Sequence, residues 1–124
     1  MNLKKFSLKW HSYSDHLRDM MKDLMNDGFA DVTLVTEERK HIKAHKNILS
    51  ACSPLFRDLI SFDKKSNSII YLRGIQFSEL ESIMQFIYYG EATFFEQRMD
   101  EFFNVAQSLE IKELFKADIL TETD

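Results

Sequence analysis

The chain has 124 residues, a net charge of −4 and 44% hydrophobic residues. That length suits one domain burying about two-thirds of its unfolded surface, and that composition excludes a disordered chain. Residues 1–62 hold ten Lys or Arg against eight Asp or Glu, and residues 63–124 hold six against twelve. Because no basic stripe is available to neutralise phosphates, we expect no direct binding of nucleic acid. The apolar runs are too short for a signal peptide or a membrane span.

The first predicted elements are a strand and a long helix. "FSLKWH", residues 6–11, alternates apolar and polar side chains as a half-buried strand does, and it has no neighbouring strand with which to form a hairpin. Residues 12–27 repeat apolar side chains at helical spacing, and Gly28 stands where a helix commonly ends. The apolar face of this helix suits either the core or an interface. It comprises Tyr13, Leu17, Met20, Met21, Leu24 and Met25.

Two strands and two short helices follow. "DVTLVT" (31–36) and "HIKA" (41–44) are typical of strands, although the connection "EERK" lacks the Gly or Asn of a common hairpin turn. We expect a helix over residues 45–51 that ends before Pro54. Ser53 and Pro54 then suit the N-cap and the first position of a second helix, with an apolar face from Leu55 to Ile60.

The rest of the chain alternates in the same way. A polar loop at 61–68 leads to the strand "IIYL" (69–72), and Ser78 with Glu81 predicts a capping box that opens a helix ending at Gly90. "ATFF" (92–95) indicates one more short strand. Two helices follow, one over Met99–Leu109 and one over Ile111–Phe115, and we expect a frayed tail at 121–124. These elements predict a single α+β domain rich in helices.

Residues 41–60 contain the only histidine and cysteine cluster. His41 and His45 are four residues apart, but they fall in a predicted strand and at the start of a helix, so they do not share one helical face. Cys52 lies in an apolar turn, where burial makes a thiol unreactive. No third metal ligand is near the two histidines except Cys52, and a chain with three glycines has no glycine-rich phosphate loop. We therefore expect no catalytic residue, no metal and no cofactor. Asp31 begins a strand and Lys46 lies near the start of a short helix, and each could be a solvated charge or a charge at a helix end.

The same region carries a family resemblance. "DVTLVTEERKHIKAHKNILSACSPLFRDLI", with "FIYYGEATF" and "VAQSLEIKEL" later, resembles the BTB/POZ domain from about Phe6 to Phe115. "FSLKWH" further resembles the opening Phe-x-Leu-Arg-Trp-Asn of the insect tramtrack group, with Lys9 in place of Arg and His11 in place of Asn. The resemblance implies the BTB/POZ fold, a helical cluster flanked by short strands, in a strand-exchanged homodimer. It divides the chain into an exchanged strand at 1–11, the domain at 12–120 and the tail at 121–124.

The resemblance also implies roles for particular residues. It places the first long helix at the two-fold axis, and it pairs the N-terminal strand with residues 92–95 of the other chain. It puts Asp31 and Lys46 at the floor of a charged dimer pocket. The dimer interface it implies comprises Phe6, Leu8, Trp10, Tyr13, Leu17, Met20, Met21, Leu24, Met25 and Phe94. The residues it implies for higher-order assembly are Phe6, Leu8, Lys9 and Trp10.

The function implied is a protein–protein interaction module at the N-terminus of a nuclear transcription regulator or chromatin protein. Its expected partners are itself, related BTB domains and transcriptional co-regulators, and a longer parent protein is expected to carry DNA-binding elements such as zinc fingers. The alternative is a substrate adaptor for a cullin ubiquitin ligase. Those adaptors carry a hydrophobic-x-Glu motif after the helix of "SPLFRDLI", whereas residues 61–68 contain no Glu.

Overall fold

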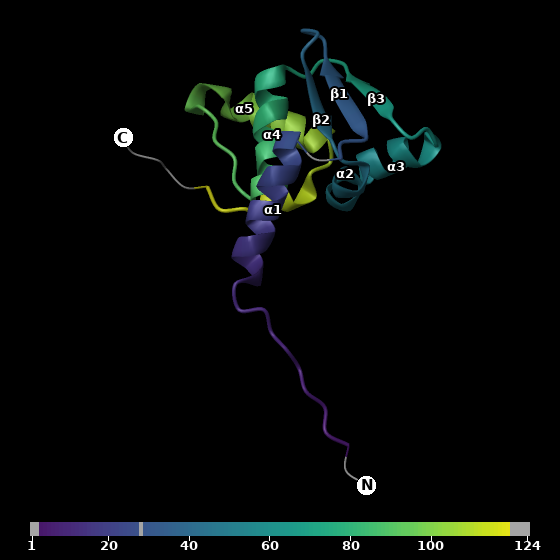
Figure 1. The fold of residues 1–124 in the computed structure, drawn as a ribbon. Helices are drawn as coiled ribbons and strands as arrows, with labels where there is room; N and C mark the ends of the chain where they lie inside the picture. Colours follow the sequence, from purple (N-terminus) through teal and green to yellow (C-terminus); the bar gives the residue numbers. More distant parts are fainter. Residues whose placement is uncertain (1–2, 28, 120–124) are drawn as a thin grey trace.

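The computed structural model describes residues 3–27 and 29–119, which form helices packed beside a small sheet (Figure 1). Gly28 and the tail at 121–124, for which a helix end and fraying are predicted, lie outside the described residues. None of the described helices is long and apolar enough to cross a membrane. The elements in chain order are α1 (Tyr13–Asp27), β1 (Val32–Thr36), β2 (His41–Ala44), α2 (Lys46–Cys52), α3 (Pro54–Phe62), β3 (Ser68–Leu72), α4 (Phe77–Tyr89), the 3-10 helix η1 (Glu96–Arg98), α5 (Met99–Ser108) and the 3-10 helix η2 (Lys112–Lys116).

β1 is the central strand of the sheet. The strand order is β2-β1-β3, with β2 antiparallel to β1 and β3 parallel to it. A parallel pair needs a crossover connection, which α2 and α3 supply here. Leu34 of β1 is opposite Ile42 on one side and Ile70 on the other. Its side chain is fully buried in one core that also contains Leu49, Phe56, Leu80 and Met84.

The β1–β2 turn explains why this hairpin manages without glycine. Arg39 adopts a left-handed conformation at φ 63°, which glycine usually supplies, and its N–H donates to the Thr36 carbonyl at 3.0 Å. The two glutamates of the turn reach the segment that starts α4. Glu37 accepts a hydrogen bond from the Gly74 N–H at 2.7 Å, and Glu38 accepts one from the Phe77 N–H at 2.6 Å.

The predicted capping box at the start of α4 is wrong. The helix begins at Phe77, one residue before Ser78, and its N-cap residue Gln76 makes no side-chain capping bond. The Ser78 hydroxyl donates instead to the neighbouring Glu79 carboxylate at 2.6 Å. Glu38 of the β1–β2 turn supplies the acceptor at the helix start, so this helix is capped from a distant part of the chain.

Two other predicted helix boundaries are confirmed. Gly90 ends α4 in the left-handed conformation at φ 80°, and its N–H donates to the Phe86 carbonyl. Ser53 caps α3, accepting from the Phe56 N–H at 3.1 Å, with Pro54 as the first helical residue. The Ser53 hydroxyl also donates to the Leu109 carbonyl at 2.6 Å, which ties this junction to the end of α5.

Three predicted elements differ from the structure. Residues 6–10 and 92–95 form no strand in the described chain, and residues 112–116 form a 3-10 helix where an α-helix was expected. A strand is defined by its hydrogen-bonded neighbour, and the resemblance places the neighbour of each predicted strand in a second chain. Both strands therefore stay predictions about an assembly.

The two bonds of Ser53 give the first testable prediction. Ser53→Ala removes both an N-cap and a buried hydrogen bond, so we expect the free energy of unfolding to fall by about 1–3 kcal/mol. Ser61→Ala is the matched control, because that hydroxyl is exposed and donates only to Asp58 of its own helix. Its expected change is within about 0.5 kcal/mol. Urea denaturation measures both, and equal losses would contradict a structural role for Ser53.

Candidate protein-interaction surfaces

α1 presents part of its apolar face to solvent. Tyr13, Leu17 and Met20 are 50%, 39% and 38% exposed. Met21 and Met25 are half-buried and pack against the core, where α1 lies beside α4 (Figure 1). Leu24 is also half-buried. The six residues predicted for one interface therefore divide between an outward set and a set that holds α1 to its own domain.

The N-terminal segment extends away from the rest of the chain (Figure 1). Phe6 and Leu8 are 87% and 100% exposed, and Lys9 is exposed as well. Trp10 is also exposed, but its ring contacts the start of α1, with centroids 5.3 Å from Tyr13 and 4.7 Å from His16. Apolar side chains this exposed, three of them alternating with polar ones, make the segment a candidate for pairing with another chain.

Phe94, predicted at the dimer interface, packs within its own chain. Its ring stacks on Phe102 with centroids 4.5 Å apart and meets the edge of Phe103 at 6.0 Å. Phe94 is half-buried, whereas the adjacent Phe95 is 79% exposed. These contacts anchor residues 92–95 against α5, close to the start of that helix.

Asp31 and Lys46 lie close together, but the contact joins the Asp31 side chain to the Lys46 backbone and not the two charged groups. The Asp31 carboxylate accepts a hydrogen bond from the backbone N–H of Lys46 at 2.8 Å, at the first residue of α2. The Lys46 ammonium group donates to the Lys65 carbonyl. Among residues 3–27 and 29–119, no ion pair joins the two side chains. Within one chain, Asp31 thus acts as a helix cap for α2.

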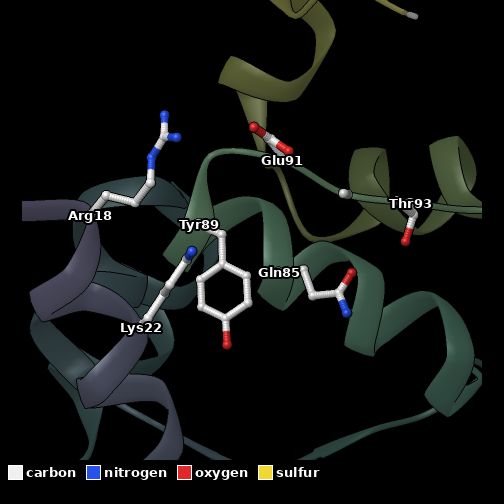
Figure 2. A pocket seen from close by; sticks show the side chains of 7 residues that line it. Arg18, Lys22, Gln85, Tyr89, Glu91 and Thr93 are labelled. Atoms are coloured by element: carbon white, nitrogen blue, oxygen red, sulfur yellow. The ribbon is translucent and has the colours of Figure 1, made fainter. Parts of the chain in front are cut away.

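A shallow hollow that the sequence did not reveal lies between α1 and α4 (Figure 2). Its volume is about 260 Å³, and Arg18 and Lys22 line it from α1. The Lys22 ammonium group lies 5.9 Å from the centre of the Tyr89 ring, within the range of a cation–π contact. Arg18 and Lys22 are one helical turn apart, but this spacing alone does not predict a hollow, because α4 forms its other wall. The site offers charged side chains and an aromatic surface.

The histidine and cysteine cluster serves the packing of the domain. The buried Tyr88 hydroxyl accepts from the His45 backbone N–H at 3.0 Å and lies 2.6 Å from Nδ1 of His45. Burial raises the pKa of Tyr88 to about 12. Burial also raises the pKa of the Cys52 thiol, with a smaller contribution from the charge of Glu113, so the thiolate is disfavoured. The described residues contain no group of three or more His, Cys, Asp or Glu that could hold a metal ion.

The buried Glu79 forms an ion pair with Arg98 that sequence reasoning missed. Burial raises the pKa of Glu79, but hydrogen bonds from Arg98 and Ser78 outweigh it, so the net shift is downward. The guanidinium of Arg98 binds both oxygens of this carboxylate and also reaches Gln76 at 2.9 Å. The pair joins α4 to η1.

Comparison with known proteins gives the class of this chain. Solved structures with the same arrangement include the BTB domain of zebrafish PATZ1, with a TM-score of 0.78 and 21% identity over 90% of this chain and 92% of that one. They also include the BTB (Tramtrack and Bric a brac) domain of human gigaxonin, with a TM-score of 0.79 and 23% identity over 93% and 95%. At this identity the likeness establishes the fold, which is the α+β fold of these BTB domains.

The sequence comparisons then establish the family. The model of the BTB/POZ domain matches residues 21–119, so the chain belongs to the BTB/POZ domain family, whose members are protein–protein interaction modules. It is 36% identical over 115 residues to the tramtrack protein, alpha isoform, of Drosophila melanogaster, covering 92% of this chain and 14% of that protein. It is 33% identical over 112 residues to the longitudinals lacking protein-like of the same species, covering 90% and 87%. The chain spans about one-seventh of tramtrack and of the Broad-complex core protein.

The role of Asp31 gives the second testable prediction. Asp31→Ala leaves the first N–H of α2 without its acceptor, so we expect a loss of about 1 kcal/mol in the free energy of unfolding. Lys46→Met is the control, because it removes an ammonium group but keeps the backbone N–H; its expected change is within about 0.5 kcal/mol. Thermal and urea unfolding measure both. Similar losses in the two variants would favour a charged pair over a helix cap.

Proposed function

We propose that the chain is the self-association module of a nuclear transcription regulator or chromatin protein, and that it homodimerises through the outward face of α1. The observation that carries this proposal is the group of large apolar side chains that α1 and the N-terminal segment leave uncovered. It comprises Phe6, Leu8, Trp10, Tyr13, Leu17 and Met20.

Physical chemistry supports a second copy as the cover for α1. Buried apolar surface contributes about 25 cal/mol per Å², so exposed Leu17, Met20 and Tyr13 represent binding free energy that is not used in one chain. These residues are spaced so that they share one face of the helix, and two such faces suit a two-fold contact of self-complementary surfaces. Methionine adapts to such a contact because its side chain is unbranched and flexible.

The N-terminal segment supports strand exchange as part of the same assembly. Residues 6–11 have the alternation of a strand, and pairing with residues 92–95 of the other copy would give both segments hydrogen bonds. Phe94 and Phe102 hold residues 92–95 against α5, so the receiving segment is already anchored. The N-terminal segment, including Lys9, would also link one dimer to the next, and Phe6 and Leu8 supply the apolar side chains for it.

The larger protein would use this module through avidity. Joining two chains raises the effective concentration of their DNA-binding segments, so paired or clustered DNA sites are bound more tightly without any contact between DNA and this domain. The net charge of −4 fits a module that leaves nucleic acid to other parts of the protein. Related BTB domains and transcriptional co-regulators are the further partners we propose, with action in the nucleus. The similarity to tramtrack and the Broad-complex core protein supports this assignment.

The α1 contact gives the third testable prediction. Leu17→Asp would place a charge without a partner in the buried contact, at a cost of about 3–5 kcal/mol, so we expect the dimer dissociation constant to rise at least about 100-fold. Multi-angle light scattering across a concentration series measures this as a lower mass than that of the native chain at each concentration, with the 14.7 kDa of one chain as the lower limit.

The control for this variant is Asn104→Asp, which adds the same charge to an exposed position on α5. It should leave the mass unchanged. A folded native chain that stays at 14.7 kDa at every concentration would refute homodimerisation.

The N-terminal segment gives the fourth testable prediction. Leu8→Asp puts a charge among the apolar side chains of the segment, so we expect the average mass to fall at every concentration and association to weaken about tenfold or more. Ser7→Asp is the matched control, because it adds the same charge to the other face of the predicted strand. Light scattering measures both variants, and an unchanged mass for Leu8→Asp would remove the segment from the assembly.

A further inference from the structure

β3 is an edge strand with an unused side. The strand order β2-β1-β3 gives β3 one neighbour, β1, and the described residues place no strand on its other side. In Figure 1, β3 is the strand of the sheet farthest from α1. An unpaired strand edge presents a row of N–H and C=O groups that can add another strand.

The sequence of β3 does not protect this edge. Proteins commonly guard edge strands with lysine, proline or a bulge, whereas Ser-Ile-Ile-Tyr-Leu (68–72) has no charged residue and no proline, and it pairs with β1 without interruption. Ile69 and Tyr71 point to the outer face of the sheet and are 76% and 58% exposed. Large exposed apolar side chains on an open edge are typical of a contact surface.

Apolar surface continues from the strand to the end of α3. A hollow of about 280 Å³ lies there, lined by Leu59, Ile60, Asp63 and residues 68–71. Phe62, the last residue of α3, is 85% exposed. An added strand would therefore meet side chains from α3 as well as the backbone edge of β3.

We propose that β3 pairs antiparallel with β3 of a second copy, around a two-fold axis at Ile70, to make one continuous sheet of six strands. This contact uses a different surface from α1 and does not rest on the function proposed above. With both contacts present, dimers formed through α1 join into larger assemblies through their sheets.

The pattern of charges identifies a second copy as the occupant. In this register Ile69 faces Tyr71 of the second copy, and Ser68 faces Leu72. Just beyond the strand, Arg73 faces Asn67, so no two like charges meet across the axis. A two-fold contact requires a strand that complements itself, and an uncharged strand with Ile opposite Tyr satisfies this requirement.

A charge exchange on the outer face tests both the contact and its register. Ile69→Glu with Tyr71→Glu places like charges opposite each other, whereas Ile69→Lys with Tyr71→Glu places each new lysine opposite a new glutamate. Both double variants change only exposed side chains, and circular dichroism checks that each remains folded. The matched pair differs in one residue and in the sign of one charge.

The measurement is sedimentation velocity across a concentration series, in the native chain and in the Leu17→Asp chain. In the Leu17→Asp chain we expect the mass to rise with concentration above the 14.7 kDa of one chain, to rise less with the two glutamates, and to regain the rise with the lysine and glutamate. In the native chain the two glutamates should lower the mass of the largest species.

Three outcomes would overturn the proposal. One is a native and a Leu17→Asp chain that never associate through β3, so that the two glutamates change nothing. Another is equal loss of association in both double variants, which would indicate that the two copies do not meet in the register proposed. The third is retention of association by both. Failure of the α1 contact is distinguishable from all three, because it appears as an unchanged mass for Leu17→Asp while the two double variants still differ.

Discussion

The arrangement of this domain depends on β1 and on the carboxylates just outside its two ends. Leu34 at the centre of β1 is fully buried, and the strand is paired on both sides. Asp31, one residue before β1, accepts from the first N–H of α2, and Glu38, two residues after it, accepts from the first N–H of α4. The first N–H groups of a helix have no partner within the helix, and they give the helix start a partial positive charge. Each carboxylate accepts a hydrogen bond from one such N–H and lies favourably beside that charge. The residues at the two ends of one strand thereby help to set where α2 and α4 begin.

The features of the fold that the sequence predicts well are those set by residues within about four positions of each other along the chain. Ser53 with Pro54 and the glycine at position 90 are local signals, and the structure uses each as expected. Ser78 carried an equally local signal, but the carboxylate of Glu38 lies 39 residues before Phe77 in the chain and takes the role at the helix start. The Arg98 contact with Glu79 is missed for the same reason, since its partners are 19 residues apart. Contacts at such separations have no periodicity for a sequence pattern to reveal.

The candidate surfaces were predictable only in part, and the division has a physical basis. Helical spacing identifies the apolar face of α1, but it does not say which of its residues meet α4. The structure assigns Met21 and Met25 to the core and leaves Leu17 and Met20 outward. The hollow beside Lys22 needs Tyr89 from another helix, so spacing along α1 could not predict it. Family resemblance supplied the predicted role of α1 at an interface, which residue types alone left open between core and interface.

The two apolar surfaces that we propose for association would bind by different means, and this difference bears on how such a module would select partners. The backbone of α1 is hydrogen-bonded within the helix, so a contact there depends on side-chain shape and burial alone, and flexible methionines tolerate changes in the partner. At β3 the free backbone groups demand an extended strand in a defined register, and a slip by one residue would send Ile69 and Tyr71 to the wrong face. The exposed side chains of Leu17, Ile69 and Tyr71 lie outside the buried core, whereas Leu72 of β3 belongs to it. Substitutions of the exposed side chains at either surface would therefore alter association while the fold is retained, which would let one scaffold carry different assembly rules.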